Sequence, residues 1–129
     1  MNSQPINITR FENAMIVLNG NRLRLKNNNS EVILSKNQTK LLVCLINEIH
    51  EKKSIINYIW NNGNCKSKEN SYSQLVHKTK EFLMQNGFPT DFIITIPRHG
   101  LCLNRSFIGS APSLHDNSVK ILNDPAFLY

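Results

Sequence analysis

The residues between positions 68 and 86 have the hydrophobic spacing of an amphipathic α-helix. Its apolar stripe comprises Tyr72, Leu75, Val76, Thr79, Phe82 and Leu83. Its opposite face comprises Asn70, Ser73, Gln74, His77, Lys78 and Glu81. Side chains of the second group can reach base edges or phosphates. Because most surface helices have a polar face, this stretch alone favours an ordinary amphipathic helix over a DNA-binding one.

Short β-prone runs precede this helix. They cover residues 6–10, 14–18, 22–26 and 31–34, and Asn19-Gly20 between the second and third suits a tight hairpin turn. Polar and apolar residues alternate strictly over 22–26, so Leu23 and Leu25 are expected to face inward. These runs predict a four-stranded antiparallel sheet. Its exposed basic residues are more simply explained as protection of a strand edge than as DNA contacts.

Two further helices are predicted between the sheet and residue 68. Ser35 and Gln38 form a capping-box pattern, which starts a helix that the apolar spacing extends to about residue 51. The second helix is expected over about 53–61, with Trp60 as a core anchor. Cys44 is expected to be a small core residue.

The segment after residue 86 predicts a β-hairpin. Asn86-Gly87 suits a helix stop, and residues 92–96 and 101–104 are strands joined by a turn at 97–100 with Arg98 and His99 at its tip. The predicted fold class is α+β: a winged helix-turn-helix with an N-terminal four-stranded antiparallel sheet, three helices and a C-terminal β-hairpin wing. Residues 1–105 form this domain. Residues 106–129 form a linker or C-terminal tail with room for one short helix.

Composition narrows the function classes. A chain of 129 residues with 40% hydrophobic and 19% charged residues suits one folded domain, and its net charge of +6 suits a polyanionic partner or an acidic membrane surface. Its three cysteines and four histidines have no spacing typical of disulfides, metal ligands or catalytic residues. We therefore expect that the protein is not an enzyme and binds no metal or cofactor. No apolar stretch approaches the roughly 20 residues of a membrane span, and the expected location is the cytoplasm.

Four motifs together resemble a known family of bacterial regulators. They are Leu34-Ser35-x-x-Gln38-x-x-Leu41-Leu42, Ile59-Trp60, Val76-x-x-x-Lys80-x-x-Leu83 and Ile94-Thr95-Ile96-Pro97-Arg98-x-Gly100-Leu101-x-Leu103. Over about residues 6–105 the chain is similar to the OmpR/PhoB-type winged helix-turn-helix domain, and most of all to the CadC/ToxR-like transcriptional regulators.

The resemblance implies a sequence-specific DNA-binding transcriptional regulator, with the third helix in the major groove of double-stranded DNA and the wing on an adjacent groove or phosphate. The implied DNA-binding residues are Asn70, Ser71, Ser73, Gln74, His77, Lys78, Lys80, Arg98 and His99. Asn70 and Gln74 have amides suited to adenine, whereas Lys78, Lys80 and Arg98 suit phosphates or a narrow minor groove.

The resemblance also implies partners besides DNA. In this family the loop before the third helix often contacts RNA polymerase. Here the loop comprises Asn61, Asn62, Gly63, Asn64, Cys65 and Lys66. A homodimer on tandem or inverted sites is the second implied assembly, because few arginines in the third helix predict modest affinity for one copy.

The chain departs from the family pattern in ways that leave alternatives open. Thr79-Lys80 stands where the family usually has Leu-Arg, and Gly100-Leu101 where it usually has Gly-Tyr. Lysine lacks the guanidinium fork, which weakens the expectation of a bidentate phosphate contact. The alternative function is a winged-helix protein-interaction module that regulates transcription through a partner without contacting DNA. We expect no receiver domain. The chain is either a stand-alone regulator or the cytoplasmic part of a longer, membrane-anchored one.

Overall fold

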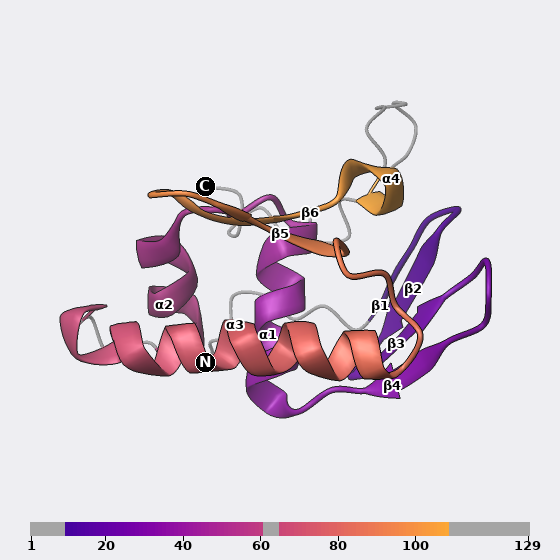
Figure 1. Cartoon of the computed structure of the whole chain (residues 1–129), viewed down its shortest axis with the longest axis horizontal. Helices are drawn as coiled ribbons and strands as arrows, with labels where there is room; N and C mark the ends of the chain where they lie inside the picture. Colours follow the sequence, from indigo (N-terminus) through magenta and orange to yellow (C-terminus); the bar gives the residue numbers. More distant parts are fainter. Residues whose placement is uncertain (1–9, 61–64, 109–129) are drawn as a thin grey trace.

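The computed structural model describes residues 10–60 and 65–108, and its element order confirms the predicted α+β layout (Figure 1). The chain first forms an antiparallel sheet in the order β1-β2-β3-β4. The strands are β1 (Arg10–Glu12), β2 (Ile16–Asn19), β3 (Arg22–Leu25) and β4 (Glu31–Ile33). Of the first predicted strand, only residue 10 lies within the described part of the chain.

The β2–β3 hairpin forms as the sequence predicts. Gly20 in the connecting turn has a φ of +65°, a backbone conformation that glycine adopts without steric cost. The alternation in β3 places Leu23 and Leu25 in the core, while Arg22 is exposed and donates to Glu31 on β4 at 2.8 Å. The one-sided hydrophobic pattern therefore sets which face of this sheet packs inward.

Helix α1 (Lys36–Ile46) begins at the predicted capping box. The Ser35 hydroxyl accepts from the Gln38 backbone N–H at 3.2 Å, and the Gln38 side chain accepts from the Ser35 N–H at 2.9 Å. The expected end near residue 51 is wrong, because the helix stops at Ile46. Glu48 adopts a φ of +63°, and the N–H of Ile49 turns back to the Cys44 carbonyl at 2.9 Å, which closes the helix end.

Two helices and the hairpin wing follow. They are α2 (Lys52–Trp60), α3 (Cys65–Gln85), β5 (Ile93–Ile96) and β6 (Gly100–Leu103). Helix α3 begins earlier than residue 68, and Gly87 ends its last turn with a φ of +96°. A short helix α4 (Arg105–Ile108) extends the described fold past residue 105, and its buried Phe107 packs on Phe92 with ring centroids 5.2 Å apart.

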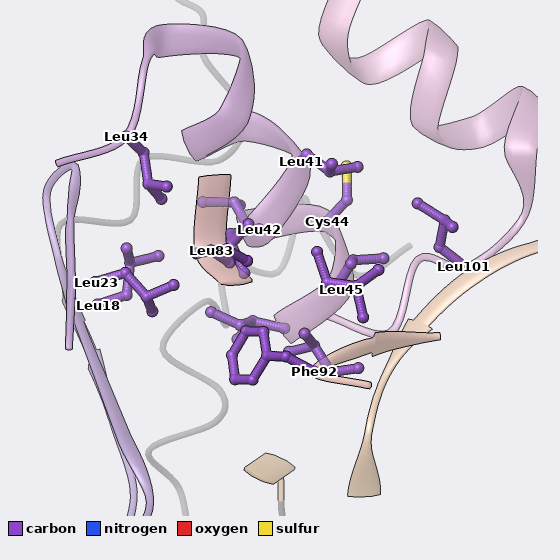
Figure 2. Close-up of a cluster of buried hydrophobic side chains, with 14 of the residues drawn as sticks. Leu18, Leu23, Leu34, Leu41, Leu42, Cys44, Leu45, Leu83, Phe92 and Leu101 are labelled. Atoms are coloured by element: carbon purple, nitrogen blue, oxygen red, sulfur yellow. The ribbon is translucent and has the colours of Figure 1, made fainter. Parts of the chain in front are cut away.

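The hydrophobic core joins the sheet, α1, the end of α3 and the wing. Figure 2 shows side chains from these elements converging: Leu18, Leu23, Leu34, Leu41, Leu42, Cys44, Leu45, Leu83, Phe92 and Leu101. The prediction for Cys44 is confirmed, and burial raises the pKa of its thiol. Trp60 is half-buried and packs at the edge of this core. Each fully buried leucine contributes about 1.5–3 kcal/mol relative to an exposed one, so this cluster fixes how α3 lies on the domain.

The apolar stripe of α3 faces the core as predicted, although its burial is uneven. Tyr72, Thr79 and Leu83 are buried, whereas Leu75, Val76 and Phe82 are half-buried and pack against the core from its edge. Thr79 is 0% exposed, and its Oγ1 has no hydrogen-bond partner within the described chain. Among residues 10–60 and 65–108, no helix combines the length and apolar character that a membrane crossing requires.

Candidate nucleic-acid interface

The outward face of α3 consists of exposed side chains that can form hydrogen bonds. They are Asn70, Ser73, Gln74, His77, Lys78 and Glu81. The helical period of about 3.6 residues places Asn70, Gln74, His77 and Glu81 opposite the buried Tyr72, Thr79 and Leu83, with Ser73 and Lys78 on their two flanks. We call this set the outward face. Ser71 and Lys80, two other residues that the sequence assigned to DNA, are half-buried on the sides of the helix.

Both acidic residues of α3 have a basic neighbour. Glu81 Oε2 lies 3.8 Å from His77 Nε2, and Glu69 Oε1 lies 3.6 Å from Lys52 Nζ at the start of α2. These exposed pairs contribute at most about 1 kcal/mol each to stability, and the first requires a protonated histidine. The Lys52 contact reduces the negative field of Glu69, whereas Glu81 is an acidic group on the outward face itself. No partner is found for Lys78 among the described residues.

Lys80 joins α3 to the wing. Its ammonium donates to the Thr95 hydroxyl on β5 at 2.6 Å. Glu69, Ser73 and Lys80 recur along one side of α3, and the contacts of Glu69 with Lys52 and of Lys80 with Thr95 show that this side adjoins α2 and the wing. The outward face and the wing are therefore neighbouring surfaces.

The wing turn, residues 97–99, is fixed against the segment that joins α1 to α2. The His99 N–H donates to the Ile96 carbonyl at 3.0 Å, and Arg98 adopts a φ of +62°. The His99 carbonyl accepts from the Lys52 N–H at 2.9 Å, and the Leu101 N–H donates to the His50 carbonyl at 3.0 Å. The side chains of Arg98 and His99 are exposed, as expected for the tip of a wing.

Gly100 permits this close backbone contact. A Cβ atom at this position would lie 1.7 Å from the His50 carbonyl oxygen, well inside any real contact. Gly100 and Glu51 pair as an isolated antiparallel bridge, so the segment before α2 lies alongside β6. Gly100 does not adopt the left-handed conformation that favours glycine. A glycine is required here because any side chain would collide with the His50 backbone.

Two lysines that the sequence did not assign to the site lie beside the wing turn. Lys52 and Lys53 begin α2 and line a shallow pocket of about 280 Å³. The other lining residues are Glu51, Tyr72, Ile96, Arg98, His99 and Gly100. The only sign of this basic surface in the sequence is the pair of adjacent lysines at the predicted start of a helix. Their proximity to Arg98 depends on the pairing of residues distant in sequence, which local patterns do not encode.

Burial affects two ionisable groups around this pocket. It raises the pKa of Tyr72, whose ring lies 5.8 Å from Lys52 Nζ, so the phenol stays neutral beside the cation. Burial lowers the pKa of His50 from its ordinary value of 6.5; Glu48 opposes this shift and His99 adds to it. His50 is therefore held neutral over more of the pH range than an exposed histidine.

The predicted polymerase-contact loop lies mostly outside the described residues. Asn61, Asn62, Gly63 and Asn64 fall in that gap, whereas Cys65 and Lys66 belong to the first turn of α3 and not to a loop. No cluster of three metal-binding side chains occurs within the described part of the chain.

Comparison with protein-family models, curated proteins and solved structures finds no match to this chain. The order of sheet, three helices and hairpin is consistent with an OmpR-like layout. Any functional assignment therefore depends on the geometry and chemistry of the surface itself.

Proposed function

We propose that this chain is a sequence-specific transcriptional regulator that binds double-stranded DNA with α3 in the major groove and the wing turn on an adjacent groove or phosphate. The observation that carries the proposal is the outward face of α3, whose exposed hydrogen-bonding side chains adjoin a wing turn bearing Arg98 and His99. An α-helix with its side chains is about 10–12 Å wide, and the major groove is about 12 Å wide.

The charges around the outward face support phosphate contacts at its edges. Lys78 lies on the helix, and Arg98 on the wing turn lines one pocket with Lys52 and Lys53 at the start of α2. Cations at the edges of a reading surface fix the register of a protein on DNA, and the groups between them contact base edges. Lys80 contributes differently, because its bond to Thr95 holds the wing beside α3.

The proposal includes a cytoplasmic location, a homodimer on tandem or inverted sites and contact with RNA polymerase through residues 61–66. The dimer follows from the composition of α3, which has no arginine between Cys65 and Gln85. One copy with few strong phosphate ligands would bind DNA weakly. A dimer would bind more tightly, because two linked binding sites have a higher combined affinity than one.

The test measures binding of the chain to duplex DNA from its own operon by fluorescence anisotropy. The salt concentration is varied from about 50 to about 200 mM, the range over which binding through phosphate contacts weakens steeply. We expect binding that weakens with salt. Lys78→Ala and Arg98→Ala should each weaken binding to every sequence and reduce the salt slope by about 1. Arg22→Ala, which removes an exposed cation from the sheet, is the matched control and should leave the slope unchanged.

The arginine-free α3 also favours a second candidate, a winged-helix module that regulates transcription through a protein partner. If the folded chain binds no duplex at low salt, the DNA-binding proposal fails and this candidate stands. If it binds but the Lys78 and Arg98 variants behave as the Arg22 control does, DNA is held by another surface.

A further inference from the structure

We infer that α3 recognises two A·T base pairs, adjacent or about two base steps apart, using the side-chain amides of Asn70 and Gln74. This inference rests on the proposed DNA-binding function and names the bases that the outward face selects. Both residues are exposed, and they lie one helical turn apart in the first half of α3. In helix-turn-helix proteins the N-terminal half of the recognition helix contacts base edges.

The spacing of the two amides fits the spacing of base pairs. Residues i and i+4 lie on the same side of a helix, separated by about 6 Å along its axis at 1.5 Å per residue. Successive base pairs are about 3.4 Å apart. A helix in the major groove is inclined to the DNA axis, so this separation projects onto about one to two base steps. Asn70 and Gln74 can therefore each reach a base edge, and the two edges belong to pairs that are adjacent or two steps apart.

The chemistry of a side-chain amide selects adenine. Its carbonyl oxygen accepts from the adenine N6 amino group while its NH₂ group donates to N7. Guanine offers two acceptors, N7 and O6, so the amide carbonyl would face an acceptor and lose its bond. A good bidentate pair of this kind discriminates against the wrong base by about five- to 150-fold.

Both amides are available without breaking an internal contact. Within the described residues neither Asn70 nor Gln74 has a hydrogen-bond partner, in contrast to Lys80, which is bonded to Thr95. Glu69, next to Asn70, has Lys52 as its partner. The N-terminal half of the outward face therefore presents neutral, bidentate groups to the bases.

The other outward residues contribute less to base choice. Ser73, between the two amides, can bond to several bases and selects none strongly. His77 lies near Glu81, and the guanine reader that is commonest in this geometry, arginine, does not occur in α3. Lys78 is a compact cation on a flexible stem, which suits a phosphate.

The experiment selects duplexes from a random pool with the full-length chain and then tests the recovered site. We expect adenines at two positions that are adjacent or about two steps apart. Replacing one of these adenines with 7-deazaadenine, which still pairs with thymine but lacks N7, should weaken binding about five- to 150-fold. Gln74→Ala should abolish this effect at one position and Asn70→Ala at the other. Lys78→Ala is the control: it should weaken all duplexes alike and retain both preferences.

The outcomes separate the inference from the proposed function. A selected site with G·C at these positions overturns the inference, and so does full binding of the 7-deazaadenine duplex; either result leaves DNA binding intact. A pool that shows no enrichment, with no retardation at low salt, overturns the proposed function itself. Thermal unfolding of the Asn70 and Gln74 variants should match that of the original chain, because both side chains are exposed.

Discussion

Replacing Gly100 with alanine should separate the wing from the segment before α2. The new Cβ would lie 1.7 Å from the His50 carbonyl oxygen, so one of the two backbones must move by more than an ångström. The movement breaks the hydrogen bonds of 2.9 Å from Lys52 to His99 and of 3.0 Å from Leu101 to His50. Each contributes about 0.5–1.5 kcal/mol net.

The expected magnitude follows from these losses. Two hydrogen bonds account for about 1–3 kcal/mol, and partial re-exposure of Leu101, now 1% exposed, adds about 1 kcal/mol. We therefore expect Gly100→Ala to lower the free energy of unfolding by about 2–4 kcal/mol, out of the roughly 5–15 kcal/mol typical of a domain. Trp60, the chain's one tryptophan, is half-buried and reports urea unfolding by its fluorescence.

The control is Gly20→Asn. Gly20 has open space around it, and asparagine tolerates its positive φ, so this variant should unfold within about 0.5 kcal/mol of the original chain. An unfolding midpoint for Gly100→Ala equal to that of the original chain would refute the reasoning, because it would mean that the wing does not pack on His50.

Two further predictions concern the buried Thr79 and the half-buried His50. Thr79→Val should raise the free energy of unfolding by about 1–2 kcal/mol in urea titrations, because it removes a buried hydroxyl without a partner in the described chain. The control is Thr39→Val, which should not stabilise the protein because the Thr39 hydroxyl donates to the Ser35 carbonyl at 2.9 Å. Equal effects of the two variants would contradict this explanation. His50 has a folded-state pKa below its unfolded value, so the unfolded chain binds more protons and stability should fall as the pH drops below about 6.5. The difference in unfolding free energy between neutral and acidic pH should shrink in His50→Gln, and an unchanged difference would exclude His50 as a cause.

Elements whose determinants are local were predictable from the sequence. The capping box at Ser35 and Gln38 and the Asn19-Gly20 turn each involve neighbouring residues, and the structure has both. The apolar stripe of α3 was also predicted, since a 3.6-residue period requires only the residues of the helix itself. These local patterns were sufficient to establish the α+β layout.

Features that depend on tertiary contacts were not predictable in this way. The early end of α1 requires Glu48 in a left-handed conformation, which no glycine or asparagine at that position signals. The bond from Lys80 to Thr95 and the position of Lys52 beside the wing turn join residues that only the folded chain brings together. The sequence therefore indicated candidates for the proposed DNA contacts, but not which of these side chains are already bonded within the protein.

Besides its packing on the core, α3 and the residues just after it make polar contacts with three different parts of the described chain. Lys52 of α2 meets Glu69 near its start, Thr95 of the wing meets Lys80, and Asn28 of the β3–β4 turn donates to the Gly87 carbonyl at 3.1 Å just past its end, close to the sheet (Figure 1). Under the proposed function, a molecule that displaced one of these contacts on binding would change the charges and side chains that border the outward face, and with them the affinity for DNA. By thermodynamic reciprocity, DNA would then change the affinity of the domain for that molecule by the same factor.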